Sequence, residues 1–327
     1  MKYWKVAQAY LSSAIVYRKS GKAAQQLFIA LKKDTPANSV NDLLRKRIRL
    51  YVAISFICAE WFSTLRGKKV SKKESEFITL IGAVTPIIDD LIDEQQLTST
   101  EIIALLESPE KSNDTHFILA KYIYSKLQEI QNPSFQEVMK KALKIQDDSL
   151  IQLGSRQLSN QEIKSITYDK GGLATLLYRV VLDHPLENGE EKAQMVLGYV
   201  MQQINDAFDI YKDTESKFQT AFTTSNNLHE NYDTFKKSIK SLVVSYAETN
   251  FNRKDIEKSL LKISVVLSQG EVCFRQLLNL QGDNEQFLIG QFKRKDLICD
   301  MEKTSNIWKT FLQSLKFYDQ VRNALYK

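Results

Sequence analysis

Acidic side chains interrupt an apolar stretch at residues 84–97, "VTPIIDDLIDEQQL". On an α-helix Asp89 and Asp93 share one face, four residues apart, and Asp90 and Glu94 form a second such pair. Like charges at this spacing repel, so a cluster that faces inward needs a compensating cation. Mg²⁺ suits this role, because it takes oxygen ligands from one or two carboxylates and keeps water or phosphate oxygens in its other positions. The alternative is a solvated acidic face, which is the more common origin of such clusters.

A second polar stripe lies in residues 198–213, "GYVMQQINDAFDIYKD". Asn205, Asp209 and Asp213 recur every four residues, which places their oxygens on one face of a single helix. Two such helices that face each other across a bundle can hold metal ions between them, as in other carboxylate-rich bundles. The alternative is an exposed helix with an ion pair between Asp209 and Lys212. The two clusters together favour a metal site.

The first cluster depends on a helix that contains a proline. Pro86 lies three residues before Asp89, and its i−4 partner is Gly82, which best tolerates the lost hydrogen bond and the ring clash. We expect the helix to continue through Pro86 and to end near the acids. Thr98 and Glu101 have the spacing of a capping box, which predicts that a new helix begins there.

Adjacent glycines interrupt a helical pattern at residues 167–179, "TYDKGGLATLLYR". Gly171 and Gly172 each cost a helix roughly 1 kcal/mol relative to alanine. The pair predicts either an unwound turn that exposes backbone groups or an ordinary helix start after a loop.

The whole chain has the composition of an all-α protein. Its 327 residues include only 11 Gly and 5 Pro, and apolar residues recur at helical spacing from end to end. We expect an all-α fold in one large helical bundle over residues 1–327, with about ten or more helices. Breaks are predicted near residues 34–40, 66–71, 97–100, 108–114, 132–134, 184–189, 214–233 and 282–284.

Charge and cysteine content narrow the partners and the setting. The net charge of +6 is modest and its basic residues are scattered, and no nucleic-acid motif accompanies them, so we expect no nucleic-acid partner. The three cysteines lack metal or redox spacing, which predicts buried reduced thiols and a cytoplasmic protein. No apolar stretch reaches the roughly 18 to 20 residues that are needed to span a bilayer.

The two acidic clusters resemble the metal-binding motifs of class I isoprenoid (terpenoid) synthases, which include trans-prenyltransferases, squalene and phytoene synthases and terpene cyclases. "DDLID" is similar to their DDxxD motif, and with Glu94 it is similar to the DDxxDE form of phytoene synthases. The second stretch is similar to the prenyltransferase motif through Gly198, Gln202, Asp206 and Asp209, with Asn205 in place of the first Asp. It is equally similar to the motif of cyclases and head-to-head synthases through Asn205, Asp209 and Asp213.

Weaker similarities extend the resemblance to roughly residues 40–215. "YDKGGL" is similar to the prenyltransferase helix break, with Lys170 near the diphosphate, and to the glycine-containing flap of phytoene synthases that begins at a Tyr, here Tyr168. "RKRIRL" is similar to the segment that grips isopentenyl diphosphate, through Lys46, Arg47 and Arg49. The glycine and proline of that segment are absent. The arginine pair that normally follows the first motif is replaced by "EQQLTST".

The resemblance implies a Mg²⁺-dependent isoprenoid synthase that ionises an allylic prenyl diphosphate, with three Mg²⁺ ions when substrate is bound. Its metal ligands would be Asp89, Asp90, Asp93, Asn205, Asp209 and Asp213, and Lys46, Arg47, Arg49, Lys170, Arg179 and Lys212 would face the diphosphate. A helix break or cavity would involve Tyr168, Gly171, Gly172, Gln202 and Asp206. Peripheral membrane contact for an apolar product and a homodimer also follow from it.

Three functions stay open at this point. The first is prenyltransferase-like chemistry, and the second is a cyclase or a head-to-head synthase of the squalene or phytoene type. The third is an inactive prenyl-diphosphate-binding protein or partner subunit, which the missing arginine pair keeps open, although the intact metal ligands of both motifs favour the first. A helical scaffold with acids merely on its surface is a further alternative.

Overall fold

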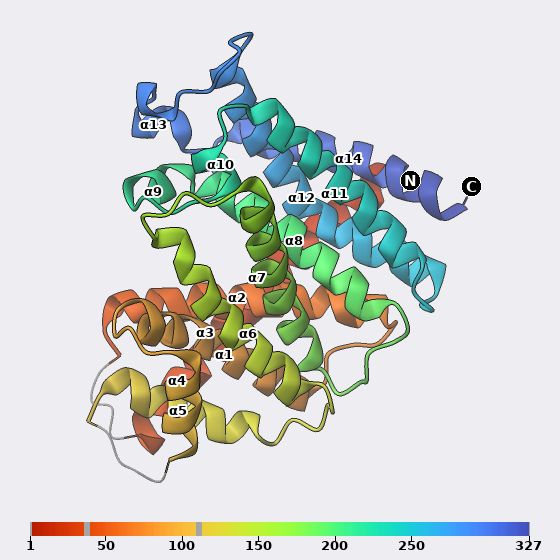
Figure 1. Cartoon of the computed structure of the whole chain (residues 1–327). Coiled ribbons are helices and arrows are strands. Elements are labelled where there is room, and N and C mark those ends of the chain that lie inside the picture. The colour runs from red at the N-terminus through yellow and green to blue at the C-terminus, as the bar shows by residue number, and fades with distance from the viewer. Residues whose placement is uncertain (1, 36–39, 109–112, 327) are drawn as a thin grey trace. The chain divides into compact units, whose positions relative to one another are not determined.

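The computed structural model describes residues 2–35, 40–108 and 113–326, which form helices joined by loops (Figure 1). No strand occurs in these residues, so the predictions of an all-α fold and of ten or more helices are confirmed. The helices are α1 (Lys2–Asp34), α2 (Asp42–Leu65), α3 (Lys72–Asp93), α4 (Ser99–Glu107), α5 (Thr115–Leu127), α6 (Phe135–Ser149), α7 (Asn160–Val180), α8 (Glu190–Phe208), α9 (Ile210–Glu215), α10 (Ala221–Thr224), α11 (Leu228–Ala247), α12 (Arg253–Gln281), α13 (Arg294–Leu297) and α14 (Thr304–Tyr326), with short 3₁₀ turns at Leu150–Leu153 and Ile289–Gln291.

The chain divides into two compact units. The N-terminal unit comprises Leu11–Asp147 and Leu176–Leu186, and the C-terminal unit comprises Met1–Tyr10, Asp148–Thr175 and Glu187–Lys327. The first acidic motif belongs to the N-terminal unit, and the second belongs to the C-terminal unit. The prediction of a single domain stays a prediction.

In the N-terminal unit, α2 and α3 pack closely because Gly82 has no side chain. A Cβ atom at Gly82 would lie 2.5 Å from Ser55 Oγ and 2.8 Å from Val52 Cα, both on α2. The Ser55 hydroxyl bridges the two helices and lies 2.9 Å from both the Val52 and the Ile78 carbonyl oxygens. α3 continues through Pro86, as expected from the sequence. Gly82 therefore has two roles: it tolerates the ring clash and lost hydrogen bond of Pro86, and it allows α2 and α3 to approach closely.

In the C-terminal unit, three glycines form a close crossing between α7 and α8. A Cβ atom at Gly171 would lie 2.7 Å from Gln202 Cβ and would also overlap the Gly198 carbonyl, and one at Gly198 would lie 2.6 Å from Gly172 Cα. α7 runs without interruption from Asn160 to Val180, so neither the unwound turn nor the helix start considered for Gly171 and Gly172 is present. The helix tolerates both glycines because their missing side chains admit the backbone of α8.

The first turns of α1 join the core of the C-terminal unit. Val6 and Ala9 are buried against Leu261 and Val265 of α12 and against Leu315 and Tyr318 of α14. Buried residues recur along the whole length of α12, as the apolar spacing of its sequence predicts.

The predicted helix ends are confirmed in part. Loops follow α2, α3, α5, α7 and α12 near the expected positions, while residues 36–39 and 109–112 lie outside the described residues. Loops at residues 154–159, 248–252 and 298–303 went unpredicted. The second contains neither Gly nor Pro, and its signal is Asn252, whose side chain caps α12 by accepting from the Lys254 N–H.

One helix among the described residues, α2, is long and apolar enough to cross a membrane by length and composition. The sequence prediction that no stretch reaches this length is wrong for α2. Within the structure, however, 56% of its most apolar window is buried, and core helices of soluble proteins meet the same test.

We predict that Gly198→Ala destabilises the protein by about 1–3 kcal/mol, because the added methyl group meets backbone atoms of α7 that cannot turn away. Urea unfolding followed by circular dichroism measures the change. Gly21→Ala is the matched control, since a Cβ atom there meets nothing within 4 Å. The control should be neutral or stabilising by about 0.5–1 kcal/mol. Equal stability of both variants would contradict the close crossing.

Candidate functional site

The first acidic motif occupies the last turn of α3. Ser71 and Glu74 form a capping box at the start of this helix, and Asp93 is its last residue, followed by Glu94 as the C-cap. Asp93 and Glu94 are exposed, Asp89 is half-buried and Asp90 is buried. The next helix begins with the predicted capping box, in which Thr98 accepts from Glu101 N–H at 3.2 Å. The sequence therefore predicted correctly where this helix ends and the next begins.

Partners from three other helices surround the two inner acids. Arg47 of α2 forms an ion pair with Asp90, and its Nη2 lies 3.9 Å from Asp89 Oδ2. His116 of α5 places Nε2 3.2 Å from the second oxygen of Asp90. Gln146 Nε2 of α6 donates to Asp89 at 3.0 Å. The half-buried charges of Asp89 and Asp90 are thus compensated by groups of the protein itself.

His116 and Gln146 are site residues that the sequence did not reveal. His116 stands alone in the sequence, with no second ligand at helical spacing, and only the packing of α5 brings it to Asp90. Tyr51 also contacts the motif, because its hydroxyl donates to Asp89 Oδ2 at 3.3 Å. No spacing rule links these residues, since each comes from a different helix.

The three predicted diphosphate contacts on α2 do not share a face. Arg47 turns toward Asp89 and Asp90, and although burial lowers the pKa of Arg47, its hydrogen bond with Asp90 raises that pKa overall. Arg49 instead lies over the ring of Phe28 of α1, with 5.8 Å between the guanidinium carbon and the ring centre. Lys46 is exposed. Arg47 is therefore the member of this basic cluster that the fold brings to the acids.

An apolar row continues along α2 from Arg47. Leu50 and Ile54 follow it at i+3 and i+7, on the same side of the helix. Both side chains are unusually open for large apolar residues, at 56% and 38% exposed. A charged group and an apolar surface thus adjoin on one helix face.

The second motif is divided between two helices. α8 ends at Phe208, Asp209 adopts φ −88° and ψ 4°, and α9 begins at Ile210. The expected stripe on one helix is therefore corrected: Asn205 belongs to α8 and Asp213 to α9. Backbone hydrogen bonds from Asp209 N–H to Asn205 O at 2.9 Å and from Asp213 N–H to Asp209 O at 2.8 Å span the junction. Asn205, Asp209 and Asp213 recur every four residues as predicted, but they do not belong to a single helix.

The acids around this junction repel one another. Burial is the main cause that raises the pKa of Asp206 to about 7; the hydrogen bond from Gln202 opposes it, and the charges of Asp213 and Asp209 add to it. Burial and the charge of Asp209 raise the pKa of Asp213 to about 6. Lys170 lowers both values, but less than burial raises them. A positive charge in addition to that of Lys170 would stabilise the ionised forms of Asp206 and Asp213.

Lys170 of α7 lies beside the second motif in the same unit. Its ammonium nitrogen is 3.3 Å from Ser149 Oγ and 5.5 Å from the centre of the Phe218 ring. Lys212 is exposed on α9. Gln202 donates to Asp206 at 2.8 Å, and the ring of Tyr168 lies 5.6 Å from that of Tyr199. The structure thus gathers Lys170, Gln202 and Asp206 near the second motif.

Arg179 has a structural position. It is only 1% exposed, and its guanidinium donates to the carbonyl oxygens of His184 and Pro185 at 3.1 Å each. These bonds hold the loop that follows α7. The sequence predicted that Arg179 faces a diphosphate. In this structure its guanidinium instead forms hydrogen bonds with the loop after α7.

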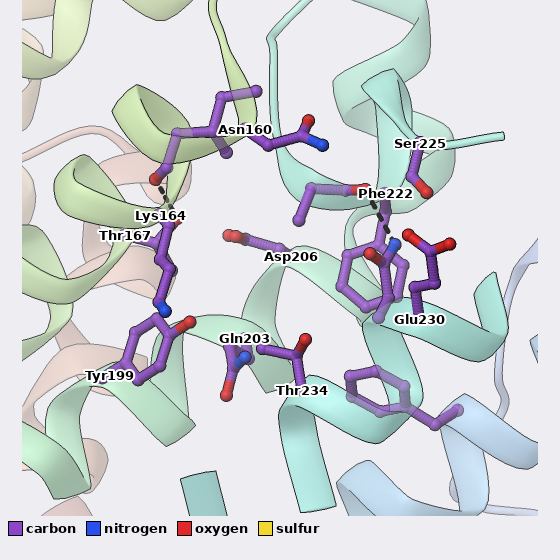
Figure 2. A pocket seen from close by; sticks show the side chains of 14 residues that line it. Asn160, Lys164, Thr167, Tyr199, Gln203, Asp206, Phe222, Ser225, Glu230 and Thr234 are labelled. Carbon is purple, nitrogen blue, oxygen red and sulfur yellow. Dashed lines mark hydrogen bonds between the residues drawn. The ribbon is translucent and has the colours of Figure 1, made fainter. Parts of the chain in front are cut away.

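A pocket of about 170 Å³ lies in the C-terminal unit beside Asp206 (Figure 2). Figure 2 shows the Asp206 carboxylate directed into the space between α7, α10 and α11. Lys164, Tyr199, Gln203 and Glu230 also line it. Of the site residues predicted from the sequence, only Asp206 lines this pocket. Asp206 therefore belongs both to the second motif and to the pocket wall.

The donor groups fit a hard divalent cation, although no formed site is present. The second motif offers carboxylate and amide oxygens whose mutual repulsion a cation relieves. Across the described ranges, no group of three or more His, Cys, Asp or Glu side chains is close enough to hold a metal ion. The shared use of Mg²⁺ by both motifs stays a prediction.

Comparisons with known proteins give fold likenesses alone. No protein-family model and no curated protein matches the chain. A crystal structure of a dehydrosqualene synthase in complex with ligand is similar over 94% of this chain and 99% of its own, at 13% identity and a TM-score of 0.46. A polyprenyl synthase from Caulobacter crescentus CB15 complexed with calcium and isoprenyl diphosphate is similar over 99% and 98%, at 14% identity and a TM-score of 0.37.

Each TM-score is below 0.5, so a function for this chain must be argued from its own residues.

We predict that the stability of the protein falls as the pH rises from about 4 to about 7, because Asp206 has a folded pKa near 7, above its ordinary value of 3.8. The stabilising contribution of the protonated form is complete below about pH 4 and is lost as the pH rises through about 7. Asp206→Asn removes the part of this dependence that Asp206 contributes, so the variant gains stability relative to the original protein at the higher pH.

Urea unfolding across this range in metal-free buffer measures the effect. Asp233→Asn is the control, because Asp233 is exposed and its pKa is lowered, first by its hydrogen bond with Lys236. A constant difference between Asp206→Asn and the original protein at all pH values would contradict the raised pKa.

Proposed function

We propose that this chain is a Mg²⁺-dependent isoprenoid synthase that ionises an allylic prenyl diphosphate. Prenyltransferase-like chemistry leads the proposal, and a cyclase or head-to-head synthase activity is the alternative within the same class. The proposed metal ligands are Asp89 and Asp93 of the first motif and Asn205, Asp209 and Asp213 of the second. Asp90 is a weaker candidate than the sequence suggested, since Arg47 and His116 already contact both of its oxygens.

The observation that carries the proposal is the crowding of carboxylates where α8 meets α9. Burial raises the pKa values of Asp206 and Asp213, the charges of neighbouring acids raise them as well, and Lys170 and Lys212 offset this only in part. A protein that needed only a stable helix end would gain nothing from such repulsion. These acids would serve as oxygen ligands of a divalent cation that carries a diphosphate, and the cation would offset their negative charges.

Bond cleavage in such a substrate requires that charge on the leaving diphosphate be neutralised. Mg²⁺, when bound, supplies most of this charge. Lys170 is the basic residue best placed near the second motif, and Arg47 is the one best placed near the first. No nucleophilic side chain is needed for this step.

An apolar surface must accompany the charged groups, because the prenyl chain and the carbocation both require water to be excluded. Leu50 and Ile54 supply such a surface on α2, directly beyond Arg47. This arrangement supports a substrate with one anionic end and one hydrocarbon end.

The contacts of Asp90 favour a second candidate of another class. Arg47 and His116 satisfy an acid that would otherwise attract metal, and the arginine pair after the first motif is replaced by "EQQLTST". A prenyl-diphosphate-binding protein or partner subunit without turnover would have these features.

We predict that Asp89→Ala and Asp209→Ala each reduce turnover at least a hundredfold, because each removes a ligand for the charge-neutralising ion. The assay combines the purified protein, Mg²⁺ and allylic diphosphates of increasing length. It is run with and without isopentenyl diphosphate and NADPH, and diphosphate release and the products are measured. A longer diphosphate indicates chain elongation, and a hydrocarbon indicates cyclisation or head-to-head coupling.

Asp233→Ala is the matched control, since Asp233 is an exposed acid of α11 with a partner in Lys236. It should leave turnover unchanged. If no substrate reacts but Mg²⁺ with diphosphate raises the melting temperature, the binding-protein candidate is favoured. If neither occurs, the proposal fails.

A further inference from the structure

The most solvent-facing line of α1 is apolar. Trp4, Leu11, Ile15 and Ile29 recur at i, i+7, i+11 and i+25, which places them within a narrow stripe along one continuous helix. Their side chains are 67%, 61%, 48% and 63% exposed. Large apolar residues scattered singly on a surface are common, but a stripe of four along one helix face is not.

The opposite face of the same helix already supplies its packing. Buried residues follow that face at helical spacing from end to end: Val6, Ala9, Val16, Ala24, Leu27 and Leu31. The outer stripe therefore contributes nothing to the contacts that hold α1 in the fold. Water covers it in the isolated chain, at the cost of exposed apolar area.

Positive charge accompanies the outer stripe. Between Lys2 and Asp34 the helix carries seven basic residues and one acid, which is Asp34 itself at the last position. Lys22 and Lys33 lie on the stripe, and Arg18 lies at its edge. An amphipathic helix with Trp and aliphatic residues on one line and Lys or Arg beside them is typical of helices that lie in the surface of an anionic membrane.

We propose that α1 docks flat on a lipid surface that contains anionic headgroups, with Trp4, Leu11, Ile15 and Ile29 inserted among the upper acyl chains. The stripe from Trp4 to Ile29 extends about 38 Å at 1.5 Å per residue, which suits a helix that lies along a surface. The basic residues beside the stripe add electrostatic attraction to the anionic headgroups.

A second copy of the chain is a poorer occupant for this stripe. Two α1 helices face to face would bring seven basic residues on each into proximity, with a single acid on each to offset them. An anionic surface has the opposite charge and removes this repulsion. The lipid proposal concerns α1 alone and does not depend on the proposed enzymatic function, so either can fail without the other.

Co-sedimentation of the full chain with vesicles tests the proposal. Vesicles of phosphatidylcholine alone are compared with vesicles that also contain phosphatidylserine, at low and high salt. We expect binding to the anionic vesicles only, weakened by salt, as the attraction between charges requires. The double variant Leu11→Gln with Ile15→Gln should bind at least roughly tenfold more weakly, because both side chains lose apolar area that contacts lipid.

Leu43→Gln is the matched control, because Leu43 of α2 is 70% exposed and lies off the stripe. It should bind as the original protein does. All variants should keep the original melting temperature, since the replaced side chains are exposed.

Two results would overturn the proposal. The first is equal binding of the double variant and the original protein to anionic vesicles. The second is an absence of vesicle binding together with a dimer, seen by analytical ultracentrifugation, that the double variant abolishes, which would assign the stripe to a second copy of the chain.

Discussion

Carboxylates that lie beside apolar side chains must be compensated, and this constraint governs both acidic motifs. At the end of α3 the compensation is built in, since Arg47 and His116 meet the two oxygens of Asp90 and Gln146 and Tyr51 meet Asp89. Around the α8–α9 junction it is incomplete, and the pKa values of Asp206 and Asp213 rise as burial and mutual repulsion dictate. The inner acids of the first motif therefore have partners within the protein, whereas the acids of the second motif have incomplete compensation.

This difference refines the roles read from the sequence. The sequence grouped Asp89, Asp90 and Asp93 as metal ligands, but the structure gives them different surroundings. Asp93 is exposed at the end of its helix, whereas Asp90 is buried within an ion pair. Exposure leaves Asp93 accessible to a cation from solution, while Asp90 would first have to leave Arg47.

Most of the fold could be predicted from the sequence, because helical periodicity and capping boxes are local properties. The end of α3 at the acids and the start of α4 at Thr98 follow from residues that are neighbours in the chain. The contacts of His116 with Asp90 could not be predicted, because they depend on how α5 packs. The junction at Asp209 was also missed, since no Gly or Pro marks it.

Glycine was the residue type most easily misread. Gly171 and Gly172 suggested a break, but they admit the backbone of α8 at Gly198 and leave α7 intact. Gly198 is also the first residue of the stretch that resembles a catalytic motif. Its presence there is explained by packing alone. A glycine at this position would consequently persist in a chain that had lost its chemistry, so the acids, rather than the glycine, distinguish an active member of such a family from a silent one.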